Sequence, residues 1–575
     1  MSFFSKNSDL TAENRLPGNE SGKISLRIKL LRLLIAIGSG VLLAMAFPPL
    51  NLSALAFVAF VPNMILAMSY IRKRELFLLG YLQGVFWGLF SFWWLREINY
   101  AIPFMLSAIL GLWFGVFMLF VRLAHRGIWL SMDAELAPYE ERKKYIPSWY
   151  RELFFAIVTA SFFPCLEYIR IQMFPWNFIG VSQYKALPLI QIAEYTGIYG
   201  ITYLIMLVNA VFASTIIQVR SSINNGKRCN LYAAMIVLVI LGNVILFGTL
   251  RMRMKNIVNQ LDCQTVNFGV VQGDISQRRH ADQRMAEEAL VTYAELSKKL
   301  LNEHPEVDIV IWPETAVPYP YFGAHDISKK YRYQLSELIT RYRKKFLIGS
   351  LDFYFNRATK EYELTNAALL FDIYGRNVSK YEKIHRVPFG EFIPFRKFLP
   401  DWVIKTIDMG RDLRAGTVYD PMQLRDYVRA GMAVCYESIF ASLCRRERQL
   451  GANIFVAISN DAWYPTSSEP EQHIANAVFR MVENGISALR IGNNGGTVLI
   501  NYNGEIVKSL LPSPIDRGQA YGVISAEVPK KTAEMTFYTK FGDVFLGILF
   551  IISLIGIGFC SHKELKFKKI RSFGD

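Results

Sequence analysis

The stretch "RAGMAVCYESIF", residues 429–440, decides how the C-terminal half of this chain is interpreted. Its apolar run is typical of a buried strand, and the run stops at Cys435, which Tyr436 and Glu437 follow. A sharp turn from strand to helix here would expose the sulfur and direct backbone N–H groups toward it. Because α/β folds collect active-site groups at strand ends, the stretch predicts an α/β fold with chemistry at Cys435.

Similar short apolar runs surround this stretch. We expect strands at "TVNFGVVQ", "VDIVIW", "KFLIGS", "NAALLFDI", "GMAVCY", "ANIFVAIS" and "TVLINY". Helical patterns lie between several of them, at "ADQRMAEEALVTYAELSKKLL", "SKKYRYQLSELITRYRKK" and "EPEQHIANAVFRMVENGISAL". These alternating elements predict one α/β domain over residues 263–530.

The remainder of the chain is much more apolar. The 575 residues are 52% hydrophobic, which is more than is typical of a soluble protein. Crossing a bilayer takes roughly 20 mainly apolar residues. Eight segments approach this length, at about 30–47, 52–70, 77–95, 101–121, 152–169, 198–218, 231–249 and 542–560. The sequence therefore predicts a multi-pass helical membrane protein.

Lysine and arginine near the segment ends predict the orientation. Basic clusters before the first segment and after the second, fourth, sixth and eighth all fall on one side if the N-terminus is cytoplasmic; Arg251, Arg253 and Lys255 disagree. The predicted layout is a flexible cytoplasmic tail (1–28), a seven-segment transmembrane domain (29–250), an extracytoplasmic α/β domain (263–530), an eighth transmembrane helix (542–560) and a basic cytoplasmic tail (561–575). The net charge of +16 then reflects topology, and no nucleic-acid partner is expected.

Three reactive side chains follow predicted strands of the α/β domain. They are Glu314 in "VDIVIWPETAVP", Lys383 in "YEKIHRVPFGEFIP" and Cys435. Taken singly, a glutamate can be a helix cap, a lysine a solvated loop residue and a cysteine a small core residue. Taken together, a carboxylate can remove the thiol proton and an ammonium can stabilise the thiolate and a later oxyanion. The six cysteines show no metal-ligand spacing, so we expect no metal.

The ordered motifs "WPETAVP", "YEKIHRVPFGEFIP", "CYES" and "SNDAWY" resemble the nitrilase-type domain of the apolipoprotein N-acyltransferases. "FPWNFIGVSQY" and "EYTGIYGITYLIMLVNA" resemble the membrane part of the same family, and the resemblance covers most of residues 30–560. It implies a nitrilase-like α-β-β-α sandwich domain beside the membrane domain. It also implies that Glu314 is the general base, Lys383 the charge stabiliser and Cys435 the nucleophile, with Glu391, Tyr436 and Glu437 as supporting residues.

The resemblance further implies an acyl transfer in two halves. Cys435 would take an acyl chain from a membrane phospholipid, with phosphatidylethanolamine as the donor, and form a thioester. The α-amine of a diacylglyceryl-cysteine at the N-terminus of a lipoprotein would then accept the chain. No metal or other cofactor is implied, and the expected location is the bacterial inner membrane with the catalytic domain on the periplasmic side.

Two departures from the family pattern concern substrate contacts. Ala281 stands near the position of an expected tryptophan, and Ile486 stands where the family has arginine after Gly485. Two other functions remain open at this stage. One is a membrane-anchored nitrilase-like amidase or hydrolase that uses water as the second nucleophile. The other is a transporter with an inactive domain, which would need intramembrane charges beyond Glu167 and Glu194.

Overall fold

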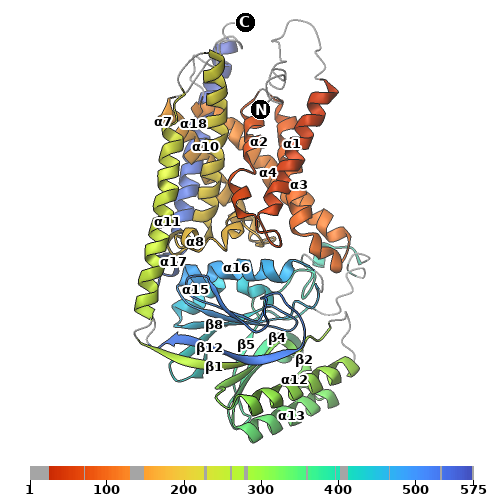
Figure 1. The fold of residues 1–575 in the computed structure, drawn as a ribbon. Coiled ribbons are helices and arrows are strands. Elements are labelled where there is room, and N and C mark those ends of the chain that lie inside the picture. Colours follow the sequence, from red (N-terminus) through yellow and green to blue (C-terminus); the bar gives the residue numbers. More distant parts are fainter. Residues whose placement is uncertain are drawn as a thin grey trace. The chain divides into compact units, whose positions relative to one another are not determined.

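The computed structural model describes residues 25–69, 71–129, 148–225, 229–259, 262–276, 283–357, 360–394, 396–401, 404, 412–464, 467–530 and 534–572. The chain forms two compact units (Figure 1). The helical unit comprises Met1–Gln183, Thr196–Phe247 and Asp543–Asp575, and the α/β unit comprises Tyr184–Tyr195 and Gly248–Gly542. The Ala281 position lies outside the described residues.

Long apolar helices make up most of the first unit. The main helices are α1 (Leu26–Met45), α2 (Val61–Ala67), α3 (Lys73–Ser91), α4 (Ala101–Ala124), α7 (Trp149–Arg170), α10 (Ile198–Asn225), α11 (Tyr232–Asn259) and α18 (Val544–Ser572). Short helical turns join them: η2 (Ser53–Phe57), η3 (Trp93–Glu97), η4 (His125–Trp129) and η5 (Ile179–Gln183). Two further short helices, α8 (Leu187–Ile190) and α9 (Ala193–Thr196), lie in the segment that belongs mainly to the α/β unit. Within the described residues, six helices are long and apolar enough to cross a membrane: α1, α4, α7, α10, α11 and α18.

Two of the eight segments expected to cross a membrane differ from these six. The segment at 52–70 is not one continuous helix, because it is divided into η2 and α2. The segment at 77–95 falls on α3, a helix of 19 residues whose first turn carries Lys73, Arg74 and Glu75. The glycine Gly84 also lowers the mean hydropathy of α3, and packing against α4 requires it. A Cβ on Gly84 would lie 2.8 Å from the Cα of Gly111 on α4, so the close approach of the helices requires small residues.

The acid predicted near the end of the fifth segment has a structural role. Glu167 on α7 is buried and accepts hydrogen bonds from the Ile179 backbone N–H at 2.6 Å and from the Thr202 hydroxyl at 2.8 Å. Arg170, one turn later, donates to the carbonyls of Trp176 and Asn177 at 3.0 and 3.3 Å. These two side chains hold the loop that leads into η5. Their contacts therefore do not require the transport pathway that the transporter hypothesis would assign to Glu167.

Two sheets form the centre of the α/β unit. Among the described residues each has six strands, in the orders β12-β1-β2-β3-β4-β5 and β11-β10-β9-β8-β7-β6. The strands of the first are β1 (Cys263–Gln272), β2 (Ile309–Pro320), β3 (Lys345–Asn356), β4 (Glu361–Phe371), β5 (Asn377–Glu382) and β12 (Ala520–Pro529). Those of the second are β6 (Met422–Arg425), β7 (Val428–Val434), β8 (Ile454–Ser459), β9 (Ala488–Gly492), β10 (Val498–Ile500) and β11 (Ile506–Ser509).

Helices cover the outer faces of both sheets (Figure 1). They are α12 (Gln283–Glu303) and α13 (Asp326–Tyr342) on the first sheet, and α15 (Ala441–Gln449) and α16 (Glu469–Asn484) on the second; η6 (Arg396–Phe398), η7 (Cys435–Ile439) and α17 (Phe537–Phe541) are short. The inner faces share one core, in which Phe268 and Ile311 belong to the same buried cluster as Met432 and Ile458. This confirms the α-β-β-α sandwich.

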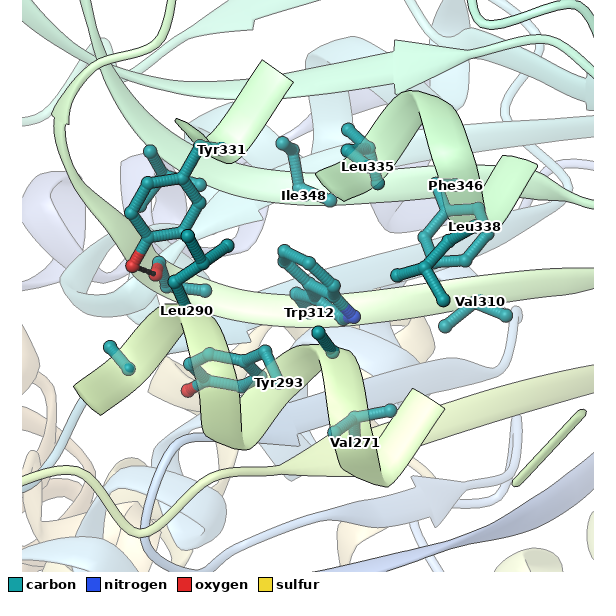
Figure 2. Packing of buried hydrophobic residues seen from close by; sticks show 14 of the residues in the cluster. Val271, Leu290, Tyr293, Val310, Trp312, Tyr331, Leu335, Leu338, Phe346 and Ile348 are labelled. Carbon is teal, nitrogen blue, oxygen red and sulfur yellow. Dashed lines mark hydrogen bonds between the residues drawn. The ribbon is translucent and has the colours of Figure 1, made fainter. Parts of the chain in front are cut away.

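A second core lies between the first sheet and its helices (Figure 2). Trp312 on β2 is fully buried there, its ring stacks on Tyr293 at 5.3 Å, and its indole N–H donates to the Ser297 hydroxyl at 2.9 Å. Because Trp312 precedes Glu314 by two residues, this packing fixes the strand that leads to the predicted base.

Candidate active site

Glu314 lies where strand β2 loses its regular pairing with β3. Their parallel register jumps between Trp312 and Val317, and Thr315 has a φ of 50°. The irregular segment approaches β3 so closely that a Cβ on Gly349 would lie 2.2 Å from the Pro313 carbonyl oxygen. A glycine is therefore needed at 349, and the bulge re-aims the Glu314 side chain, as bulges beside active sites often do.

Lys383 follows β5 directly and is 1% exposed. Its Nζ donates to Glu314 Oε1 at 3.1 Å and to Glu391 Oε1 at 2.9 Å. Burial alone would lower the pKa of Lys383, but the carboxylates of Glu314 and Glu391 outweigh it and raise that pKa well above its ordinary value. The lysine is therefore a fixed ammonium rather than a solvated loop residue.

Cys435 ends strand β7 at the start of η7, as the sequence predicts. It has a φ of 53°, a left-handed conformation that is uncommon outside glycine. Loss of hydration raises the pKa of the half-buried thiol well above its ordinary value, the charge of Glu314 raises it further, and Lys383 opposes both. The structure thus brings Cys435 within the electrostatic reach of both other predicted residues. In the resting site the thiol keeps its proton.

Asn366 is a site residue that motif reasoning missed. It lies on β4 and is 3% exposed. Its Nδ2 donates to Glu314 Oε1 at 2.8 Å and to Glu391 Oε1 at 3.1 Å, the same two oxygens that Lys383 contacts. An amide in the apolar run "LTNAALL" was the available signal, because a buried polar side chain must find partners.

Glu437 connects the turn of Cys435 to the segment of Lys383. Its Oε1 accepts from the backbone N–H groups of Ile384 at 2.7 Å and His385 at 2.9 Å, and its Oε2 accepts from that of Val434 at 2.8 Å. The Tyr381 hydroxyl also lies 3.0 Å from both oxygens. Burial raises the pKa of Glu437 to about 7, although these donors and Lys383 oppose the shift. These contacts hold the two strand ends at a fixed separation.

The two other supporting residues occupy different surroundings. Glu391 Oε2 accepts from the Val387 backbone N–H at 2.9 Å, so this acid is bound on both oxygens. Tyr436 is buried, and its ring packs edge-on against Phe440, which stacks on His385 at 4.1 Å. Glu391 therefore orients Lys383, whereas Tyr436 packs the wall behind the nucleophile.

A further charged group lies beside the thiol. The Cys435 sulfur, an Asp461 carboxylate oxygen and a His473 ring nitrogen lie within 4.8 Å of one another, which is a separation that a metal ion could bridge. Asp461, however, already accepts from the Ser459 hydroxyl at 2.8 Å and forms a short ion pair with Arg490. Because a metal would have to displace Arg490, a hydrogen-bonded ion network describes this group better than a metal site.

Comparisons with known proteins agree in both halves of the chain. Residues 39–211 match the family model described as apolipoprotein N-acyltransferase N-terminal domain, and residues 269–536 match that of carbon-nitrogen hydrolase. An apolipoprotein N-acyltransferase of Geobacter metallireducens is 31% identical over 518 residues, covering 89% of this chain and 92% of that protein. One of Rickettsia typhi is 27% identical over 489 residues, covering 82% and 86%. A carbon-nitrogen hydrolase structure from Helicobacter pylori aligns at 16% identity over 45% of this chain and 89% of that chain, with a TM-score of 0.32.

Proposed function

Because this chain belongs to the apolipoprotein N-acyltransferase family, we propose that it moves an acyl chain from a membrane phospholipid to the N-terminal α-amine of a lipoprotein through a thioester on Cys435. The observation that carries the proposal is the Lys383 ammonium, held between Glu314 and Glu391 at 3.1 and 2.9 Å beside a cysteine at a strand end. That arrangement supplies a base, a fixed cation and a nucleophile.

In the first half-reaction, the Cys435 sulfur attacks the sn-1 ester carbonyl of the donor while Glu314 takes the thiol proton. The raised thiol pKa makes this base necessary, because little thiolate forms without it. Lys383 stabilises the negative charge that develops on the carbonyl oxygen. The tetrahedral intermediate expels the lysophospholipid oxygen, which recovers the proton from Glu314, and the thioester remains.

In the second half-reaction, the α-amine of the diacylglyceryl-cysteine attacks the thioester carbonyl. Glu314 removes a proton from the attacking nitrogen, the new amide forms and the Cys435 sulfur leaves and is protonated again. We expect phosphatidylethanolamine as the donor. Both substrates keep their acyl chains in the bilayer, since removing a chain costs about 0.8 kcal/mol per methylene. A multi-pass membrane protein suits such substrates better than a soluble hydrolase does.

The test uses the purified full-length protein and phosphatidylethanolamine labelled in its sn-1 acyl chain. We expect a protein-bound label that neutral hydroxylamine removes, as it cleaves thioesters. Addition of a diacylated lipopeptide with a free α-amine should move the label to the peptide, whereas an N-acetylated lipopeptide should not accept it. If the label instead appears as free fatty acid at the same rate with and without lipopeptide, the enzyme is a hydrolase and the proposal is wrong.

We also propose that the α/β unit faces the periplasm, on the outer side of a bacterial inner membrane. Two of the three basic residues that disagreed with this orientation are paired. Arg251 and Lys255 contact the buried Glu194 at 2.6 and 2.8 Å, so this acid offsets one of the two positive charges. The proposal rests on the basic clusters at the ends of the other segments, which outnumber these three residues. The same pairing gives Glu194 a structural role.

The orientation predicts different labelling of two cysteines that flank α11. Cys229 precedes this single candidate span and Cys263 follows it, and both are half-buried. A membrane-impermeant maleimide applied to intact spheroplasts should modify Cys263 and should modify Cys229 only after the membrane is disrupted. Peptide mass spectrometry identifies each site. Modification of Cys229 but not Cys263 in intact spheroplasts would reverse the orientation.

A further inference from the structure

His473 on α16 lies against the turn that carries Cys435, and it is fully buried. Its Nε2 is 3.1 Å from the Cys435 carbonyl oxygen and 2.9 Å from the Ser438 hydroxyl. A carbonyl oxygen can only accept a hydrogen bond, so Nε2 must carry a proton and donate. The imidazole therefore binds the main chain of the nucleophile itself.

The other ring nitrogen of His473 is held by charged groups. Its Nδ1 lies 3.4 Å from Asp461 Oδ1, 3.4 Å from Glu469 Oε1 and 3.3 Å from Arg490 Nη2. Burial lowers the pKa of His473 and Arg490 opposes protonation too, but the two carboxylates outweigh them and raise that pKa. The ring is therefore held from both sides, with Nε2 facing the Cys435 carbonyl and the Ser438 hydroxyl.

The position that Nε2 contacts is a strained one. Cys435 has a φ of 53°, a left-handed conformation that brings its Cβ too close to the following carbonyl oxygen. Such a conformation persists only where the surroundings determine it. Because the peptide group is planar, holding the Cys435 carbonyl also fixes the direction of the next backbone N–H.

The same network also reaches the sulfur. Ser459 interacts with the Cys435 thiol, donates its hydroxyl proton to Asp461 Oδ1 at 2.8 Å and accepts from Arg490 Nη2 at 3.0 Å. Asp461 in turn faces His473. The network that fixes the His473 ring therefore extends to the surroundings of the thiol.

We propose that His473 is a positioning residue, whose Nε2–H holds the Cys435 carbonyl and so keeps the nucleophile in the left-handed conformation that acyl transfer uses. The inference rests on the proposed function, because acyl transfer is what gives the left-handed conformation of Cys435 a purpose. It requires no contact between His473 and substrate, and it assigns the Asp461, Glu469 and Arg490 cluster the task of fixing the ring.

Two substitutions separate the two sides of the ring. His473→Gln places an amide N–H near the position of Nε2 and keeps the donor to Cys435, whereas His473→Asn retains polar contact only near Nδ1. We expect His473→Asn to slow thioester formation about 10–100-fold, since a displacement of roughly 1 Å at a reacting group can cost 10²-fold. His473→Gln should remain within about threefold of the unchanged protein.

Alkylation of Cys435 by iodoacetamide, followed by peptide mass spectrometry, gives a second readout that requires no lipid substrate. We expect about a tenfold slower rate in His473→Asn and recovery in His473→Gln. His304→Asn is the control for the substitution, because His304 is an exposed helix-end residue paired with Glu306. It should leave both rates unchanged.

Three outcomes would overturn the proposal: His473→Asn matching the unchanged protein in both rates, equal losses in the Asn and Gln variants, or failure of both variants to fold where His304→Asn folds. The last two would show that a donor at the Nε2 position is not what the site needs from His473. If no variant or unchanged protein forms a thioester, the proposed function fails, and the alkylation rates still decide the role of His473.

Discussion

Cys435→Ala is expected to form no hydroxylamine-sensitive acyl adduct. Removing the nucleophile of a covalent mechanism lowers the rate by on the order of 10⁴–10⁶-fold, which places adduct formation below detection. No other described thiol lies in the cluster with Glu314 and Lys383, since Cys165, Cys444 and Cys560 are buried elsewhere in the fold. Incubation with labelled phospholipid, gel separation and hydroxylamine treatment measure the adduct.

The fold should survive this substitution. Alanine at a φ of 53° meets the same Cβ crowding as cysteine does, so no new backbone strain is introduced. Cys444→Ala is the matched control, because Cys444 is a fully buried core thiol on the neighbouring helix α15. It should lose some stability and keep the adduct. A normal adduct in Cys435→Ala, or its loss in Cys444→Ala alone, would assign the nucleophile wrongly.

The site residues that the sequence predicts are those with local signals. Glu314 and Cys435 each follow an apolar run with buried-strand character, and a strand end is where an α/β fold exposes side chains. Lys383 follows the mostly polar strand β5, and its motif is the signal that identifies it. The neighbourhood of these residues, by contrast, depends on long-range register. Asn366 lies on a strand that reads as core, and it reaches Glu314 because β3 and β4 pair antiparallel beyond the bulge in β2.

His473, Asp461 and Arg490 illustrate the same limit. They come from a helix, a strand end and another strand, and only the pairing of β8 with β7 and β9 brings them beside Cys435. The membrane half shows a different limit. Window hydropathy predicts α1, α4, α7, α10, α11 and α18, where the apolar signal is strong. For 52–70 it does not show that the helix is divided into η2 and α2, so whether this segment crosses the membrane stays a prediction.

Lys383→Met is expected to slow thioester formation by about 10²–10³-fold, the cost of losing one donor to a developing oxyanion. The loss should exceed that of an ordinary charge, because the ammonium neutralises two acids. Without it, Glu314 and Glu391 face each other across Asn366 alone. Removing one partner of a buried ion pair also costs roughly 3–5 kcal/mol, so a lower unfolding temperature should accompany the slower reaction.

Lys380→Met is the matched control, because Lys380 lies on strand β5, which Lys383 follows directly. Lys380 lies three residues earlier, is partly exposed and pairs with Asp352 at 2.7 Å and Glu382 at 3.1 Å. Because Asp352 is buried, this variant should also lose stability. Lys380 contacts Asp352 and Glu382 rather than Glu314 and Glu391, so adduct should form at nearly the unchanged rate. The comparison shows whether losing any lysine in or next to β5 slows the reaction, or only losing the ammonium of Lys383.

Lys383→Arg decides whether charge alone is sufficient. Arginine keeps the positive charge but replaces a compact ammonium with a wide planar fork. Two carboxylate oxygens lie within 3.1 Å of Lys383 Nζ, and the exposed fraction of Lys383 is below 2%. Asn366 already binds the same two oxygens. The fork cannot occupy that point without displacing Asn366 or moving Glu314 from the thiol. We therefore expect Lys383→Arg to lose most of its thioester formation while the protein remains inserted in the membrane. Near-normal rates in both Met and Arg variants would make Lys383 a structural ion-pair residue, and a normal rate in Arg alone would reduce its role to charge without geometry.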